Sequence, residues 1–186
     1  MTLPNAMIYF SGLSNPTRMI GLAAYLFAAM LCAIAWTRRI GTARPPKLAA
    51  SLAILNAGLF IDIWMEGRWR LHDLLQAEAI TRNLYSQRTG PQFVVLGMLG
   101  ATAMTGMMLA STRPRGRPGA SVAACGAILA LSCWCAEVIS LHTVDAVLYH
   151  TVKGVMLVTL IWTISSLTMG LGIQWDARAA CALDRD

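Results

Sequence analysis

The chain has 186 residues, of which 56% are hydrophobic and 13% are charged, and its formal net charge is +6. This composition excludes an ordinary soluble domain, in which about a quarter of the residues are charged. The basic excess lies in short loops between apolar stretches, which excludes a nucleic-acid-binding surface and indicates a membrane protein.

Five apolar stretches follow one another along the chain, and each is long enough to cross a hydrocarbon layer of about 30 Å. They are 19–36, 48–65, 93–111, 120–141 and 152–173. Because lipid offers the backbone no hydrogen bonds, each stretch should be an α-helix. We therefore expect an all-α integral membrane helical bundle, a single transmembrane domain over residues 1–186 with four or five transmembrane helices.

The first and third connecting loops are basic and contain no acid. Their basic residues are Arg38, Arg39, Arg44, Lys47, Arg113, Arg115 and Arg117. Loops rich in Lys and Arg tend to stay on the cytoplasmic side. We expect a multi-pass protein of the bacterial cytoplasmic (inner) membrane, with its N-terminus in the periplasm.

The longest connection, between the second and third stretches, has a helical pattern of its own. Its apolar residues recur at helical spacing with polar residues between them, namely Leu71, Leu74, Leu75, Ile80 and Leu84. We predict an amphipathic extramembrane helix near 67–88 on the outer face, which either continues the second span or bends at Gly67. At the last corner, we predict that Thr143 is the N-cap of the following helix and that Asp145 lies in its first turn.

Small residues recur four apart in two of the stretches. They are Ala49, Ala53 and Ala57 in the second, and Gly97, Ala101 and Thr105 in the third. Such rows let two helix backbones approach closely. We interpret them as packing seams, either within the chain or against a partner.

The expected topology places all three histidines on the outer side together with most of the acids. One hypothesis is a metal site made by Glu66, His72, His142 and Asp145, or a haem bound by two of His72, His142 and His150, since imidazole and carboxylate suit such groups. The alternative, which we favour, is that Asp62 and Glu137 pair with Arg68, Arg70 or Lys153, and that the histidines cap helix ends.

Two segments, 84–92 and 139–146, contain the sequences Leu-Tyr-Ser-Gln-Arg-Thr-Gly-Pro-Gln and Ile-Ser-Leu-His-Thr-Val-Asp-Ala. They resemble a loosely defined group of small bacterial multi-pass membrane proteins, which often carry a Trp-Tyr, Arg-Arg-Pro-x-Gln stretch and an Ile-Ser-x-His-x-Val-Asp stretch. The resemblance implies the same helix layout and marks Tyr85, Arg88, Gln92, His142 and Asp145 as notable positions. It implies no activity.

The sequence contains no catalytic signature that we can identify. We expect a non-catalytic accessory or structural subunit of a larger respiratory or photosynthetic electron-transfer assembly, with other membrane-protein subunits and the lipid bilayer as partners. The residues that we expect at such contacts are Tyr85, Arg88, Gln92, Trp134 and Trp162. The alternative is a small membrane redox protein that binds a metal or haem, and lipid or pigment contacts are also open.

Overall fold

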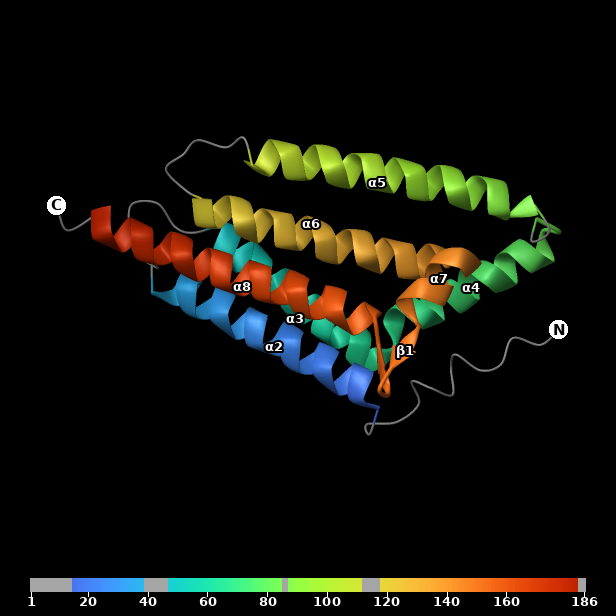
Figure 1. The fold of residues 1–186 in the computed structure, drawn as a ribbon, viewed down its shortest axis with the longest axis horizontal. Helices are drawn as coiled ribbons and strands as arrows, with labels where there is room; N and C mark the ends of the chain where they lie inside the picture. The colour runs from blue at the N-terminus through green and yellow to red at the C-terminus, as the bar shows by residue number, and fades with distance from the viewer. Residues whose placement is uncertain (1–14, 39–46, 85–86, 112–117, 184–186) are drawn as a thin grey trace.

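The computed structural model describes residues 15–38, 47–84, 87–111 and 118–183, and in these ranges the chain is an all-α helical bundle with one short hairpin (Figure 1). In chain order the elements are α2 (Pro16–Thr37), α3 (Lys47–Met65), α4 (Gly67–Thr81), α5 (Thr89–Ser111), α6 (Pro118–Ile139), α7 (His142–Leu148), β1 (Thr151–Val152), β2 (Val155–Met156) and α8 (Val158–Leu183). The expected fold class is confirmed.

Four of the helices are long and apolar enough to cross a membrane. These spans are Pro16–Thr37, Lys47–Met65, Thr89–Ala110 and Pro118–Ile139, and they coincide with the first four apolar stretches of the sequence. The remaining long helix, α8, carries Gln174, Asp176 and Arg178 near its C-terminal end.

The long helices lie side by side, and α8 occupies the middle of the bundle (Figure 1). It packs against α2 on one side and α6 on the other, while α3 packs mainly on α2 and α5 packs along α6. The hydrophobic core lies between these helices. Its almost completely buried side chains include those of Tyr25, Ile63, Trp162 and Met169. In contrast, α5 lies at the edge of the bundle, and in the part of the chain that the structure describes it packs mainly on one long helix, α6.

The contact between α6 and α8 depends on glycine. A Cβ atom on Gly126 would stand 2.8 Å from the carbonyl oxygen of Ser165, and one on Gly172 would stand 2.7 Å from the amide nitrogen of Ala123. These are backbone atoms, so the two helices can approach this closely only where side chains are absent. The seam was not among the rows predicted from the sequence.

The two predicted rows of small residues have different surroundings. In α3, Ala49 is buried and Ala57 is exposed, so the row only begins in the core. In α5, Gly97, Ala101 and Thr105 are all exposed. The second row is therefore not a seam within the described chain.

The start of the last long helix differs from the prediction. Residues 151–156 form a hairpin in which Lys153 and Gly154 have φ values of 51° and 83°, as a two-residue hairpin turn of the primed type requires. The amide of Met156 donates a hydrogen bond of 3.0 Å to the hydroxyl of Thr17, which ties the hairpin to the start of α2. As a result, α8 begins at Val158 rather than at residue 152.

The corners at the same end of the bundle also correct two details. The N-cap of α7 is Leu141 rather than Thr143, although Asp145 does lie in the first turn. The chain bends between α3 and α4 at Glu66, which has a φ of 58°. The bend carries α4 across the end of the bundle to contact α6, and α4 ends at Thr81 rather than near residue 88.

Candidate functional site

An ion cluster closes the bundle where α3, α4, α6 and α8 meet. Arg68, in the first turn of α4, is 1% exposed. Its Nε donates a hydrogen bond of 2.6 Å to Oδ2 of Asp62, and its Nη1 donates one of 2.7 Å to Oε1 of Glu137. A single guanidinium thus joins two carboxylates that come from different helices.

Two tryptophans and a cysteine complete the cluster. The indole Nε1 of Trp162 donates a hydrogen bond of 3.0 Å to the same oxygen of Glu137, and Sγ of Cys133 lies 3.4 Å from it. The Arg68 guanidinium lies 5.0 Å from the ring centroid of Trp162 and 5.5 Å from that of Trp69. Both distances are within the range of a cation–π interaction.

These contacts maintain the charge of Arg68 in a buried position. Burial disfavours the charged form, but the carboxylates of Glu137 and Asp62 outweigh burial and raise the pKa of Arg68 above its ordinary value. A guanidinium that keeps its proton exchanges none with a substrate. The geometry therefore supports a structural role, in which Arg68 fixes the exit of α4 from the bundle.

A second ion pair lies at the bend between α3 and α4. Nη1 of Arg18, in α2, lies 2.9 Å from Oε1 of Glu66, and Nη2 of Arg18 donates to the carbonyl of Trp64. Glu66, at the bend, thus joins the start of α4 to α2 through Arg18. The expected pairing of Asp62 and Glu137 with a neighbouring arginine is confirmed, and one arginine, Arg68, serves both.

The corner between α6 and α7 brings together residues that are far apart in the sequence. The side-chain amide of Gln92, in α5, donates hydrogen bonds of 3.0 Å and 3.3 Å to the carbonyls of Ile139 and Ser140. Nδ1 of His72, in α4, lies 3.1 Å from the carbonyl of Val138. The carbonyls at the end of α6, which lack partners within the helix, are thus bonded by side chains from α4 and α5.

Asp145 lies at this corner and accepts a hydrogen bond from the hydroxyl of Ser140, which has a φ of 47°. Burial raises the pKa of Asp145 above its ordinary value, while the bond to Ser140 and the nearby side chains of His72, His142 and Arg88 act in the opposite direction. The two segments 84–92 and 139–146 therefore meet here, through Arg88 and Gln92 on one side and His142 and Asp145 on the other. Tyr85 lies outside the described residues.

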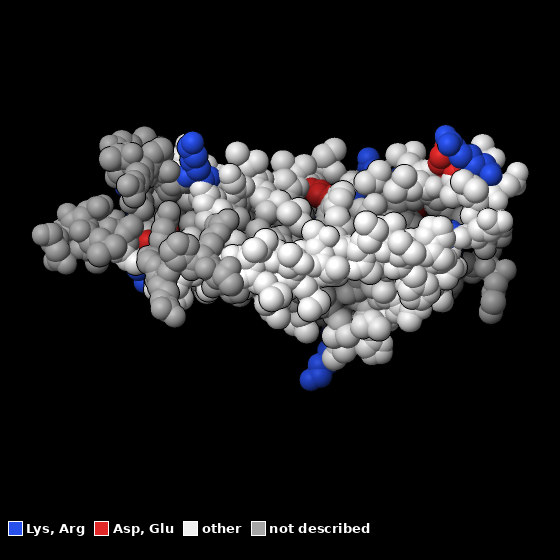
Figure 2. Space-filling model, turned by 90° about the horizontal axis from the view of Figure 1, so that it is seen from above, with Lys and Arg blue, Asp and Glu red and all other residues white. Residues whose placement is uncertain are grey.

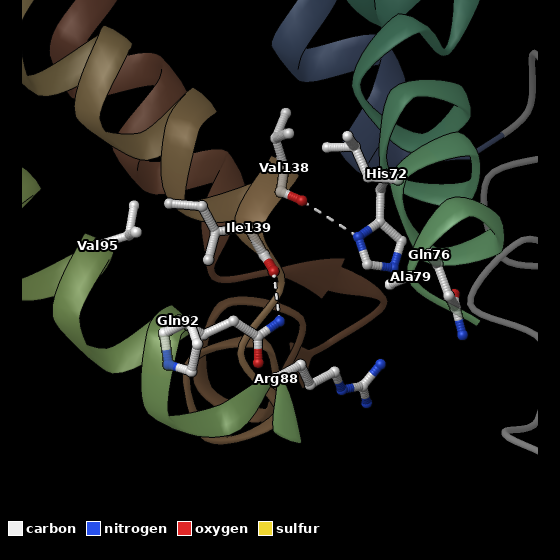
Figure 3. A pocket seen from close by; sticks show the side chains of 10 residues that line it. His72, Gln76, Ala79, Arg88, Gln92, Val95, Val138 and Ile139 are labelled. Carbon is white, nitrogen blue, oxygen red and sulfur yellow. Dashed lines mark hydrogen bonds between the residues drawn. The ribbon is translucent and has the colours of Figure 1, made fainter. Parts of the chain in front are cut away.

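A lateral pocket opens beside this corner, between α4, α5 and the end of α6 (Figure 3). Its volume is about 250 Å³. Four polar side chains line it, those of His72, Gln76, Arg88 and Gln92, and the remaining lining residues are apolar. In Figure 3 the His72 ring and the Gln92 amide point towards the end of α6, and the Arg88 side chain extends between α5 and α4.

Of the four residues in the hypothetical metal site, His72, His142 and Asp145 lie near one another at the corner between α6 and α7, whereas Glu66 lies at the bend between α3 and α4. Glu66 is bound to Arg18, His142 and His150 are exposed, and His72 faces a backbone carbonyl. Within the described ranges, no three His, Cys, Asp or Glu residues form a group that could hold a metal ion. The structure does place the three histidines at one end of the bundle, in or next to α4 and α7 (Figure 1).

The two deep tryptophans contact the chain's own core. Trp162 is completely buried against Gly21, whose Cβ atom would stand 2.6 Å from the indole ring. Trp134 is half-buried and packs against the same core. The bond between Trp162 and Glu137 was not predicted, because no local pattern in the sequence pairs these two side chains.

Comparison with known proteins adds no further identification. No family model, no curated protein and no solved structure matches this chain.

Proposed function

We propose that this chain is a non-catalytic subunit of a larger assembly in the bacterial cytoplasmic membrane, and that α5 is the helix that docks it to another membrane protein. The exposure of α5 carries the proposal. Only 6% of its apolar stretch is buried, compared with 28–39% in the other three spans. A helix with so little packing of its own has a wide face available to a partner.

The outward face of α5 is suited to close helix packing. A Cβ on Gly106 would stand 3.2 Å from Ile128 of α6, so Gly106 faces the bundle. Gly97 lies nine residues earlier and, at about 100° per residue, points in the opposite direction. Among the described residues, no atom lies within 4 Å of the Cβ position of Gly97. The small residues Ala101 and Thr105 continue this face along the helix.

Two exposed methionines, Met104 and Met108, lie on the same face and are 65% and 66% exposed. Methionine is flexible and adapts to irregular partners. Figure 2, which looks down on α5, shows an uncharged surface along the middle of this side, with charged residues near its margins. The face thus combines small residues for a close approach with adaptable apolar ones.

The charged groups within the bundle support a structural subunit rather than an enzyme. Asp62, Glu66 and Glu137 are each engaged by arginine, and these bonds hold helices together. The expected host, a respiratory or photosynthetic electron-transfer assembly, stays a prediction, as does the periplasmic position of the N-terminus.

Affinity purification of the chain in mild detergent, followed by native electrophoresis and mass spectrometry, tests the proposal. We expect a stable partner for the wild type, and we expect Gly97→Leu to release it. The matched control is Gly58→Leu, since Gly58 is also an exposed helical glycine with no atom within 4 Å of its Cβ position in the described chain. A chain that migrates alone, or only with copies of itself, would contradict the proposal.

The same sample distinguishes the redox alternative. Stoichiometric metal, or a haem absorption band that survives purification, would replace the accessory-subunit proposal with a redox one.

A further inference from the structure

The pocket between α4, α5 and α6 lies at the boundary of two candidate spans. The span of α5 begins at Thr89, and that of α6 ends at Ile139. Arg88 and Ile139 both line the pocket. Because the ends of a span lie near the lipid headgroups, this part of the pocket is at headgroup depth.

Along α5, the lining changes from polar to apolar with depth. Arg88 precedes the span, whereas Val95 lies six residues inside it, which corresponds to about 9 Å along a helix. Leu75, Val95 and Val138 are among the six apolar residues of the lining. The ten lining residues include no acid, since Asp145, whose carboxyl interacts with Arg88, is not one of them. The pocket thus places the cationic Arg88 before the start of the span and the apolar Val95 within it (Figure 3).

We propose that this pocket binds an anionic phospholipid. The lipid phosphate lies at Arg88, at the positive end of the α5 dipole, and the first part of an acyl chain lies along Val95 and Leu75. Guanidinium groups and helix N-termini both favour phosphate. The cavity of about 250 Å³ matches part of a lipid rather than a whole one, and the remainder of the chains extends into the bilayer.

The bound lipid would have a structural consequence for α5. Gln92 bonds the start of α5 to the end of α6, and α6 is the one long helix on which α5 packs in the described chain. A lipid between α4 and α5 adds a second attachment at the same level. This inference does not depend on the docking face at Gly97, which lies on another side of the helix.

The test uses the purified full chain after delipidation, with native mass spectrometry and thermal unfolding as readouts. Dioleoylphosphatidylglycerol is compared with dioleoylphosphatidylcholine and with sodium phosphate. We expect one phosphatidylglycerol to bind per chain, more tightly than phosphatidylcholine, and to raise the melting temperature. Sodium phosphate alone should give little stabilisation.

Two variants test the location of the lipid. Arg88→Gln should weaken phosphatidylglycerol binding by about tenfold to a hundredfold, since a hydrogen bond to a charged group contributes about 1.5–3 kcal/mol. Val95→Trp keeps the charge but fills the apolar part of the pocket, and it should reduce binding of the lipid without any change at Arg88. The matched control is Arg82→Gln, because Arg82 is exposed, outside the pocket and paired with Glu78.

Three results would overturn the inference. Equal binding of the two lipids would show that the pocket does not select an anionic headgroup. Equal losses of phosphatidylglycerol binding in Arg88→Gln and Arg82→Gln would indicate that the lipid is attracted to basic residues in general. Full stabilisation by sodium phosphate, with no further effect of lipid, would assign the site to a free anion. The melting temperature of each variant without lipid separates these results from a folding defect.

Discussion

Nη1 of Arg68 and Oε1 of Glu137 lie 2.7 Å apart, although 69 residues separate them in the sequence. Both side chains are inaccessible to solvent, at 1% and 0% exposed. The bond joins α4 to the end of α6, where α4 crosses the end of the bundle. The same helix, α4, contributes one wall of the lateral pocket through His72 and Gln76.

Replacing Arg68 by methionine should strongly destabilise the bundle, because Asp62 and Glu137 would lose their shared counter-charge in a buried position. Removing one partner of a buried ion pair costs about 3–5 kcal/mol. We expect a loss of this size in the free energy of unfolding measured in detergent. The control, Arg70→Met, changes an exposed arginine on the same helix and should cost no more than about 0.5 kcal/mol. Similar losses in the two variants would disprove the role of the cluster.

Gly126→Ala should separate α6 from α8. The added Cβ would stand 2.8 Å from the Ser165 carbonyl and 2.9 Å from the Met169 amide, and neither backbone atom can move alone. Overpacking of this kind costs about 1–3 kcal/mol. In contrast, Gly58→Ala meets no atom within 4 Å among the described residues and should be neutral or slightly stabilising, since alanine favours helix. The measurement is thermal unfolding of both variants, and a seam that tolerates Gly126→Ala would contradict the close packing.

The pH dependence of stability should contain a contribution from Asp145. Burial raises the pKa of Asp145 in the folded chain, so the folded state holds this proton more tightly than the unfolded state does. Stability from this group is then greatest below its unfolded pKa and is lost as pH rises through the folded pKa. We expect Asp145→Asn to remove this loss, so that its melting temperature relative to the wild type improves as pH rises from about 4.

The control for this titration is Asp73→Asn, which changes an exposed acid on α4 and leaves Asp145 in place. The melting temperature of Asp73→Asn should fall with rising pH in the same way as that of the wild type. If the melting temperatures of Asp145→Asn and the wild type differ by the same amount at every pH, Asp145 does not titrate in this range.

Sided labelling tests the membrane crossing itself. In a chain without its native cysteines, single cysteines at His150 and Asp73 should react with an impermeant maleimide from one side, since α4 and the hairpin lie at the same end of the bundle. A cysteine at Arg38, at the opposite end of α2, should react only from the other side. The distribution of basic residues predicts that Arg38 lies on the cytoplasmic side. Labelling of all three positions from one side would contradict a membrane-spanning α2.

The positions of the spans could be predicted from the sequence because length and hydropathy are local properties. The stretches at 19–36, 48–65, 93–111 and 120–141 agree with α2, α3, α5 and α6 to within a few residues. A bend at Gly67 was one of the two alternatives that the sequence left open, and the structure has the bend one residue earlier, at Glu66. The hairpin at Lys153 and Gly154 was not predicted, since its strands have two residues each and the apolar pattern continues through them.

Only the tertiary structure decided which groups pair and which faces remain open. The sequence indicated that the acids near the span ends need basic partners. In the structure, Arg68 pairs with both Asp62 and Glu137, and Arg18 pairs with Glu66. These pairings depend on the bend at Glu66 and on the position of α6. Likewise, two rows of small residues were visible in the sequence, yet the tight seam formed elsewhere, between α6 and α8. Hydropathy acts on each segment separately and drives it into lipid, whereas ion pairing and close packing depend on distances between segments, which exist only once the helices have assembled.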